Sequence, residues 1–408
     1  MNDHTNKTLP LGVVALLSLG MLSPGAQAQV RDLQQQQQQQ NTPPTTAAPA
    51  SGTQLSFGGY VKLDAIWSNP SAGAGVSADQ QLEPGAIPVG PGAGADEHGQ
   101  VKLHARQSRL FAKAITPTEL GNLSAYIEGD FFGAAGNETV SNSNGFRIRH
   151  AYGTLGGLLA GQTWTNFSDP SVYPETVDFG GPAAQIFSRQ AQVRWTHAFD
   201  GGQWSVALEN PESQVTLKDG TIFRADDDKV PDLTGQLKFQ TTLGDFSVAG
   251  LLRQIRVASS KNPVSRESAV SGGLGVNGFI RFGQDDLRLY LYGGQGVGRY
   301  SNGLITEATL GETGPWHLAP QWLGGIAYRH VWSDTLRSTA AVSALKAHFG
   351  EGAFPGATQQ VSSAHLNLIW SPVQKTNFGL EYIRGHRQTV DGLEGHLDRV
   401  QASAQFLF

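Results

Sequence analysis

The sequence contains no cysteine, few charged residues and no strongly basic segment. The absence of cysteine from all 408 residues excludes a disulfide framework and a thiolate metal site. Asp, Glu, Lys and Arg make up 15% of the chain, below the roughly 25% of soluble domains. The formal net charge is −5, and no run of five or more basic residues occurs. We therefore expect no nucleic-acid partner.

Long hydrophobic runs are also missing after the N-terminal segment. Residues 1–28 have the pattern of a signal peptide: Lys7 supplies a positive charge, residues 11–22 are apolar, and Ala26-Gln27-Ala28 is a small-x-small cleavage site. An N-terminal anchor helix is the alternative, but the apolar region is shorter than the ~20 residues of a comfortable span. Such a leader on a cysteine-free chain with 51 glycines indicates the envelope of a Gram-negative bacterium.

Residues 29–53 form a segment of biased composition. Seven glutamines occupy 34–40, and Pro43, Pro44 and Pro49 follow. The glutamine tract is too short to hold a helix alone, since isolated helices below ~12–15 residues are marginal. We expect a disordered tail and linker, with a small oligomerising stub as the alternative.

Residues 54–408 alternate between polar and apolar side chains in a repeated pattern that predicts an all-β fold. The pattern gives about sixteen strands, joined alternately by short turns and long loops, as in a transmembrane antiparallel β-barrel with short periplasmic turns and long extracellular loops. About sixteen strands leave space for an aqueous channel. The expected strands are 55–67, 101–115, 123–132, 146–155, 158–165, 190–195, 203–209, 233–242, 246–257, 268–282, 287–297, 321–332, 336–348, 359–370, 376–387 and 397–408.

Aromatic residues near the expected strand ends suit the membrane interfaces. The last strand alternates to a terminal aromatic, Phe408, which is typical of outer-membrane barrels. Interfacial girdles of aromatic side chains flank the apolar band of such barrels. We assign to these girdles Trp67, Tyr152, Trp332, Trp370, Tyr382 and Phe408.

Basic residues gather on the expected lumen face of strands two to six. They form a predicted ladder, with two acids on the strand between them, and closely spaced cations can draw anions through a narrow aperture. The alternative is an ordinary set of neutralised lumen charges without selectivity, because every porin interior is polar. The predicted lining residues are Arg109, Lys113, Glu128, Asp130, Arg147, Arg149 and Arg194.

A long loop, 166–188, follows the fifth expected strand and carries both acids and apolar residues. Folding into the barrel would bury the apolar groups and narrow the pore. We expect the loop acids Glu175 and Asp178 to face the ladder and hold its guanidinium groups. The alternative is an outward loop packed on itself or on a neighbouring subunit.

The sequence supports neither an enzyme nor a resident cofactor or metal. The eleven histidines show no metal-ligand spacing, and no Ser or carboxylate partner of His150 or His365 can be identified from the sequence. Asp226-Asp227-Asp228 is either a solvated charge run, which we favour, or a site where a divalent cation meets lipopolysaccharide. A ligand-gated transporter would need a plug domain before the barrel, and the preceding segment is too short for one.

Motifs in strands two to six and the long loop resemble the DcaP-like outer-membrane porins. They cover under a third of the chain, and the array is more specific than any one of them. The motifs are Arg106-Gln107-Ser108-Arg109, Tyr126-Ile127-Glu128-Gly129-Asp130-Phe131-Phe132, Phe146-Arg147-Ile148-Arg149-His150-Ala151-Tyr152-Gly153, Ala160-Gly161-Gln162-Thr163-Trp164, Asp178-Phe179-Gly180-Gly181-Pro182 and Arg189-Gln190-Ala191-Gln192-Val193-Arg194.

The resemblance implies a sixteen-stranded trimeric porin for dicarboxylates and related organic anions. Members often carry a longer N-terminal heptad region than residues 29–40 provide. We therefore expect a passive channel in the outer membrane, with lipid, lipopolysaccharide, small anionic solutes and two further copies of the chain as partners. The alternative is a general or sugar-permeable porin without anion selectivity.

Overall fold

The computed structural model describes residues 52–70, 79–93, 99–134, 140–224, 228–256, 268–303, 305–310 and 316–408. The expected signal peptide and nearly all of the segment 29–53 lie outside these residues, and their assignments stay predictions. Among the described residues no helix is long and apolar enough to cross a membrane. Helical structure in this part of the chain consists of the 3-10 turns η1 (Pro84–Ala86), η2 (Pro170–Val172) and η3 (Gly298–Tyr300).

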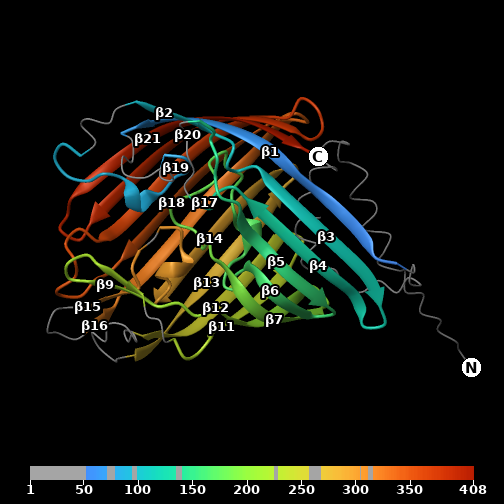
Figure 1. The fold of residues 1–408 in the computed structure, drawn as a ribbon, viewed down its shortest axis with the longest axis horizontal. Coiled ribbons are helices and arrows are strands. Elements are labelled where there is room, and N and C mark those ends of the chain that lie inside the picture. Colours follow the sequence, from blue (N-terminus) through green and yellow to red (C-terminus); the bar gives the residue numbers. More distant parts are fainter. Residues whose placement is uncertain are drawn as a thin grey trace, which may run out of the picture.

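The chain forms a closed antiparallel β-barrel of sixteen strands, which confirms the expected fold (Figure 1). One barrel strand is interrupted, because β2 and β3 both pair with the same side of β1. The barrel elements are β1 (Gln54–Asn69), β2 (Gln100–His104), β3 (Arg109–Thr118), β4 (Gly121–Asp130), β5 (Arg147–Leu155), β6 (Leu158–Trp164), β7 (Arg189–Phe199), β8 (Gly202–Glu209), β11 (Asp232–Gln240), β12 (Gly244–Arg256), β13 (Ser268–Phe282), β14 (Asp285–Gln295), β17 (Pro320–Ser333), β18 (Leu336–Ala347), β19 (Thr358–Trp370), β20 (Thr376–Thr389) and β21 (Glu394–Leu407).

The first and last strands close the barrel. β1 pairs with β21 from Tyr60 opposite Leu407 to Asn69 opposite Asp398. The start of β1 and the C-terminus lie at the same end of the barrel as the short turns, such as the β3–β4 turn (Figure 1). Closure leaves no free sheet edge in the hydrocarbon, where unpaired backbone groups are costly.

Side chains alternate between a buried interior face and an exposed outer face that is largely apolar. In β1, Lys62, Asp64 and Ile66 are buried, whereas Val61 and Leu63 are exposed. Five of the six expected girdle residues point outward, with exposed fractions between 39% and 61%: Trp67 39%, Trp332 61%, Trp370 49%, Tyr382 45% and Phe408 58%.

Tyr152 does not belong to the girdle, and its assignment was wrong. Between β4 and β5, Glu128 pairs with His150 but the next residue, Gly129, pairs with Ile148, so Arg149 is an extra residue on β5. A bulge of this kind inverts the alternation beyond it. Tyr152 consequently faces inward and packs on Tyr126 with ring centroids 5.6 Å apart.

The long loops lie at the opposite end of the barrel from the start of β1 and the C-terminus, and they build a second, smaller sheet (Figure 1). This four-stranded sheet was not expected from the sequence. Its strands are β9 (Gln214–Leu217), β10 (Ile222–Arg224), β15 (Ala308–Leu310) and β16 (Trp316–Leu318). In this region Asp228 accepts hydrogen bonds from the backbone and hydroxyl of Ser213 at 3.1 and 2.7 Å. Asp226 and Asp227 lie outside the described residues.

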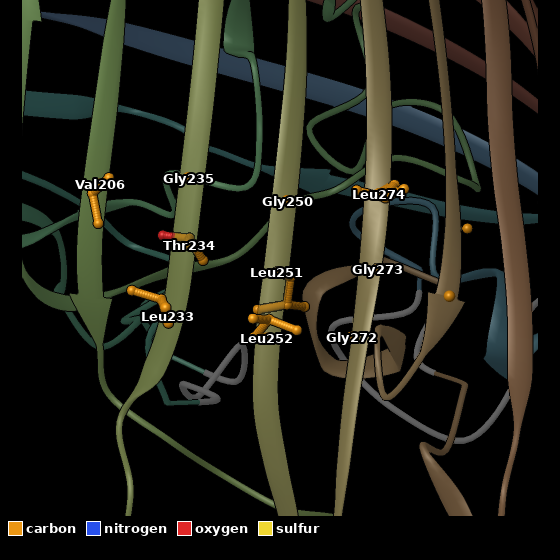
Figure 2. Close-up of a pocket in the computed structure, with 12 residues that line it drawn as sticks. Val206, Leu233, Thr234, Gly235, Gly250, Leu251, Leu252, Gly272, Gly273 and Leu274 are labelled. Atoms are coloured by element: carbon orange, nitrogen blue, oxygen red, sulfur yellow. The ribbon is translucent and has the colours of Figure 1, made fainter.

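A hollow of about 670 Å³ lies across β8 and β11 to β14 (Figure 2). It exists where glycines on neighbouring strands provide no side chain, for example where Gly235 pairs with Gly250. Three of its four lining leucines are exposed: Leu233 at 40%, Leu252 at 58% and Leu274 at 70%. The hollow therefore opens on the outer, lipid-facing side of the wall and is separate from the interior site.

Candidate functional site

Three arginines and two carboxylates form a network on the interior side of β3, β4 and β5, which we call the arginine wall. Arg149 bridges both acids, with Nε 2.8 Å from Glu128 Oε1 and Nη1 3.0 Å from Asp130 Oδ2. Arg147 contacts Asp130 through two nitrogens at 2.9 and 3.1 Å. Arg109 Nε lies 3.5 Å from Glu128 Oε1. One positive charge remains after the two acids are balanced.

The bulge in β5 explains how neighbouring strands deliver so many charges to one place. It turns Arg149 toward the acids although His150, the next residue, also faces inward. The acids are held from behind: Tyr126 donates its hydroxyl to Glu128 Oε2 at 2.7 Å, and the Phe132 N–H donates to Asp130 Oδ1 at 3.1 Å. Asp130 is fully buried, whereas the Arg147 and Arg109 side chains retain 33% and 22% of their exposure. Arg109 and Arg147 are thus the accessible part of the network, whereas Arg149 is buried.

Aromatic rings lie next to guanidinium groups of the arginine wall. Phe179, in the loop 166–188, stacks on Phe132 with ring centroids 4.4 Å apart. Arg147 and Arg149 lie 5.5 and 5.4 Å from the Phe179 ring centroid. An aromatic ring favours a nearby cation through its quadrupole but neutralises no charge. Phe179 was not among the predicted site residues.

Arg189, at the start of β7, is a further cation near the wall that the sequence analysis did not select. Its guanidinium lies 4.6 Å from the Trp164 ring centroid and 5.3 Å from that of Phe187. Among the described residues, its buried Nη1 has no hydrogen-bond partner and the guanidinium has no ion pair. Arg149 and Arg147 are the strongest charges acting on it. Strand alternation gave no reason to select Arg189. It lies an odd number of positions from Arg194, so a regular strand would place the two side chains on opposite faces.

The other two predicted cations lie apart from the wall. Lys113 is further along β3, opposite Tyr126, and within the described part of the chain it forms no ion pair. Arg194 is half-buried on β7. Glu209 and Tyr152 are the groups that act electrostatically on its charge. The structure therefore brings together Arg109, Arg147 and Arg149, but it does not extend them into one continuous ladder with Lys113 and Arg194.

The loop 166–188 lies inside the barrel, where it contacts inward-facing side chains of several strands. Glu175 pairs with Arg337 on β18 at 2.6 Å, and Asp169 pairs with Lys238 on β11 at 3.1 Å. The backbone carbonyl of Val177 accepts from Lys62 Nζ at 2.7 Å. The apolar loop residue Phe167 is completely buried. These contacts, with β1, β11 and β18, hold the loop across the barrel interior.

The expected pairing of the loop acids with the ladder was wrong. Glu175 is held by Arg337, and Asp178 accepts the Leu82 N–H at 3.0 Å and lies 3.7 Å from Arg399 on β21. The physical reason is that each acid lies next to an arginine of a strand that the loop contacts, β18 for Glu175 and β21 for Asp178. The ring of Phe179, rather than either carboxylate, faces the arginine wall.

His365 has partners that sequence reasoning missed. Its Nδ1 lies 2.8 Å from Glu381 Oε1 and its Nε2 lies 3.0 Å from Ser363 Oγ. The order resembles a Ser–His–carboxylate triad. All three side chains are buried, and Ser363 accepts the Ala183 N–H at 2.9 Å while Glu381 accepts the Val177 N–H. The loop covers the hydroxyl, so the group anchors the loop.

The site has charged groups that can attract and guide solutes, within a closed barrel that presents apolar side chains outward. These features define an outer-membrane channel of the porin class, without enzymatic activity. A model of the DcaP outer membrane protein family matches residues 27–408. The chain therefore belongs to this family and resides in the outer membrane of a Gram-negative bacterium.

Solved structures with the same barrel support the fold assignment. The outer membrane channel DcaP of Acinetobacter baumannii is similar with a TM-score of 0.72 at 23% identity, over 89% of this chain and 100% of that chain. The trimer form of OmpT from Vibrio cholerae gives 0.54 at 12%, over 88% and 100%. An anion-selective porin from Comamonas acidovorans gives 0.51 at 12%, over 88% and 100%. No curated protein matches the chain.

Proposed function

We propose that this channel is a passive, anion-selective porin for small carboxylates, including dicarboxylates. The observation that carries the proposal is the excess of positive charge at the arginine wall. Arg109, Arg147 and Arg149 face two carboxylates, and Arg189 adds a cation that has no ion pair among the described residues. A fixed positive excess in a confined aqueous space raises the local concentration of anions.

The type of cation favours carboxylate substrates. Arginine remains charged at every working pH, and its planar fork can grip a carboxylate through two hydrogen bonds. The wall offers partly exposed guanidinium groups whose other nitrogens are already fixed by Glu128 and Asp130. A second carboxylate on the same solute can engage another cation before the first is released. Weak, repeated binding of this kind permits passage.

The loop 166–188 supplies the constriction in this proposal. It occupies the barrel interior and places Phe179 near Arg147 and Arg149. The solute would pass between the cations and the loop, with the aromatic ring limiting the width and excluding water from one side of the guanidinium groups. Reduced access of water strengthens charge recognition.

We further propose that the channel is a homotrimer surrounded by outer-membrane lipid and lipopolysaccharide. Support comes from the apolar outer face and from trimeric porins of the same fold, such as the trimer form of OmpT. A porin of similar fold, from Comamonas acidovorans, is described as anion-selective, which supports the proposed selectivity.

A general porin is the second candidate, and a specific observation favours it. Many interior cations elsewhere are neutralised locally: Arg337 by Glu175, Arg288 by Asp286, and Arg253 by Glu307. If these pairs set the field of the whole interior, small ions of either sign would pass.

The two candidates differ in the reversal potential of single channels in a salt gradient. In a KCl gradient, the zero-current potential of an anion-selective channel has the sign of the chloride equilibrium potential. The gradient should be applied at low ionic strength, because the screening length is about 10 Å near 0.1 M and about 3 Å near 1 M. A potential near zero, or of the sign set by potassium, would favour the general porin.

A further inference from the structure

The last two strands carry a group of metal-ligating side chains on the outer face, away from the channel interior. His386 on β20 is paired directly with His396 on β21, and Gln388 is paired with Glu394 two positions further along, on the same face of the sheet. Potential ligand atoms of His386, His396 and Glu394 all lie within 4.8 Å of one another. Sequence spacing conceals this group, because the two histidines come together only through the β20–β21 hairpin.

Strand alternation shows that the group points outward. On β20, Glu381 and Ile383 are buried in the interior, whereas Tyr382 is 45% exposed. His386 has the same parity as Tyr382, and Glu394 and His396 are exposed on the neighbouring strand. His386 is four residues beyond Tyr382, about 13 Å along the strand at ~3.3 Å per residue. The group therefore lies beyond Tyr382, near the loop end of the β20–β21 hairpin, where we expect the outer-leaflet headgroups.

The three side chains are arranged for coordination. The His386 and His396 rings have centroids 4.8 Å apart and are inclined by 32°. His386 Nε2 lies 3.8 Å from Glu394 Oε2, too far for a good hydrogen bond. In a tetrahedral zinc site with bonds of ~2.0–2.1 Å, ligand atoms are separated by roughly 3.3–3.5 Å. Small side-chain rotations would bring the observed atoms to that separation.

Neighbouring residues hold the carboxylate and limit competing charges. Gln388 Nε2 donates to Glu394 Oε1 at 2.9 Å, which leaves Oε2 directed toward His386. The backbone carbonyl of Glu394 accepts the Gly90 N–H at 3.0 Å. Two positions before His386 on the same face, Arg384 is paired with Asp398 at 2.9 Å, so its positive charge is balanced. Mutation of residues that orient metal ligands through hydrogen bonds commonly lowers the metal affinity by ~10–100-fold.

We propose that His386, His396 and Glu394 form a surface site for Zn²⁺ or a similar borderline transition metal ion. Two imidazoles and one carboxylate suit Zn²⁺, Ni²⁺ and Cu²⁺, whereas Mg²⁺ and Ca²⁺ prefer all-oxygen sites. Three protein ligands leave a fourth position open to water on the exposed side. The bound ion would connect β20 to β21 at the outer rim.

The test is zinc binding to the full mature chain in detergent micelles, purified without a polyhistidine tag and treated with chelator. Isothermal titration should be performed at mildly alkaline pH, because a metal ion binds the neutral imidazole. We expect one Zn²⁺ per chain, no comparable heat with Mg²⁺ or Ca²⁺, and loss of binding under acidic conditions as the imidazoles are protonated. Co²⁺ in place of Zn²⁺ should give the visible absorption of a four-coordinate ion.

Matched variants assign the binding to this group. His396→Gln and Glu394→Gln should each weaken zinc binding at least tenfold, and Gln388→Ala should have a smaller effect. His197→Gln is the control, because His197 is exposed on β7 and contacts Trp204 rather than another potential ligand. Folding of each variant is checked by its mobility on an unheated gel. Absence of zinc binding to the wild type, or unchanged affinity in both folded ligand variants, would overturn the proposal.

Discussion

Glu175 in the loop 166–188 and Arg337 on β18 form a two-pronged ion pair, with oxygen–nitrogen distances of 2.6 and 2.8 Å. Arg337 also donates to Ser371 at 2.8 Å, which fixes its orientation. The pair fastens the loop to β18, and the position of the loop in turn places Phe179 near Arg147 and Arg149.

Arg337→Gln should loosen the loop without removing it. Glu175 keeps 30% of its exposure, so the loss of stability should be smaller than the ~3–5 kcal/mol of a fully buried pair that is broken. We expect more current fluctuation and a modest rise in mean conductance in planar bilayers. Arg281→Gln is the matched control, since Arg281 forms an exposed pair with Asp245 outside this contact. Equal effects of both substitutions would contradict the anchoring role.

Deleting residues 173–181 should raise single-channel conductance several-fold. The deletion removes Glu175, Asp178 and Phe179 together with the segment that crosses toward β20 and β21. The measurement requires a folded barrel, verified by gel mobility. A folded deletion variant with wild-type conductance would place the constriction elsewhere.

The closed barrel should be heat-modifiable. Because β1 pairs with β21 along most of its length, no edge is free to fray, and the barrel should resist detergent at room temperature. Unheated and boiled samples should migrate differently on a denaturing gel. Identical migration of the two samples, with a helical circular dichroism spectrum, would contradict the fold.

Arg189→Gln should reduce anion preference without stripping a partner from any carboxylate. Within the described residues Arg189 has no ion pair and rests on Trp164 and Phe187. Removing one charge ~8 Å from a passing anion costs about 0.5 kcal/mol in a water-like dielectric, or roughly a twofold change in the permeability ratio. The reversal potential measures this change. An unchanged potential at low salt would show that Arg189 does not act on the permeating ion.

Much of the fold could be predicted because barrel strands obey a simple two-residue period. All sixteen expected strands correspond to strands of the barrel, and the outward aromatic residues were mostly correct. The bulge at Arg149 was not predictable, because one extra residue leaves no distinct pattern in the sequence. It alone reverses the assignment of Tyr152.

The site was harder to predict than the strands because its contacts join distant parts of the chain. Residue types and strand faces correctly predicted that Arg109, Arg147 and Arg149 lie together. Glu128 and Asp130 are their neighbours, as expected. The partners of the loop acids depend on which wall the loop follows. The same limitation hid the Ser363–His365–Glu381 group, whose members are connected by hydrogen bonds across β19 and β20.

The central claim is that the positive excess at the arginine wall makes the channel select anions. The most direct test compares reversal potentials of wild type, Glu128→Gln and Arg147→Gln/Arg149→Gln in the same KCl gradient near about 0.1 M. We predict anion preference in the wild type, stronger preference after Glu128→Gln, and a shift toward cations in the double variant, with all differences shrinking near ~1 M salt. Equal reversal potentials for the three folded channels at low salt would contradict the claim and leave the arginine wall a structural network.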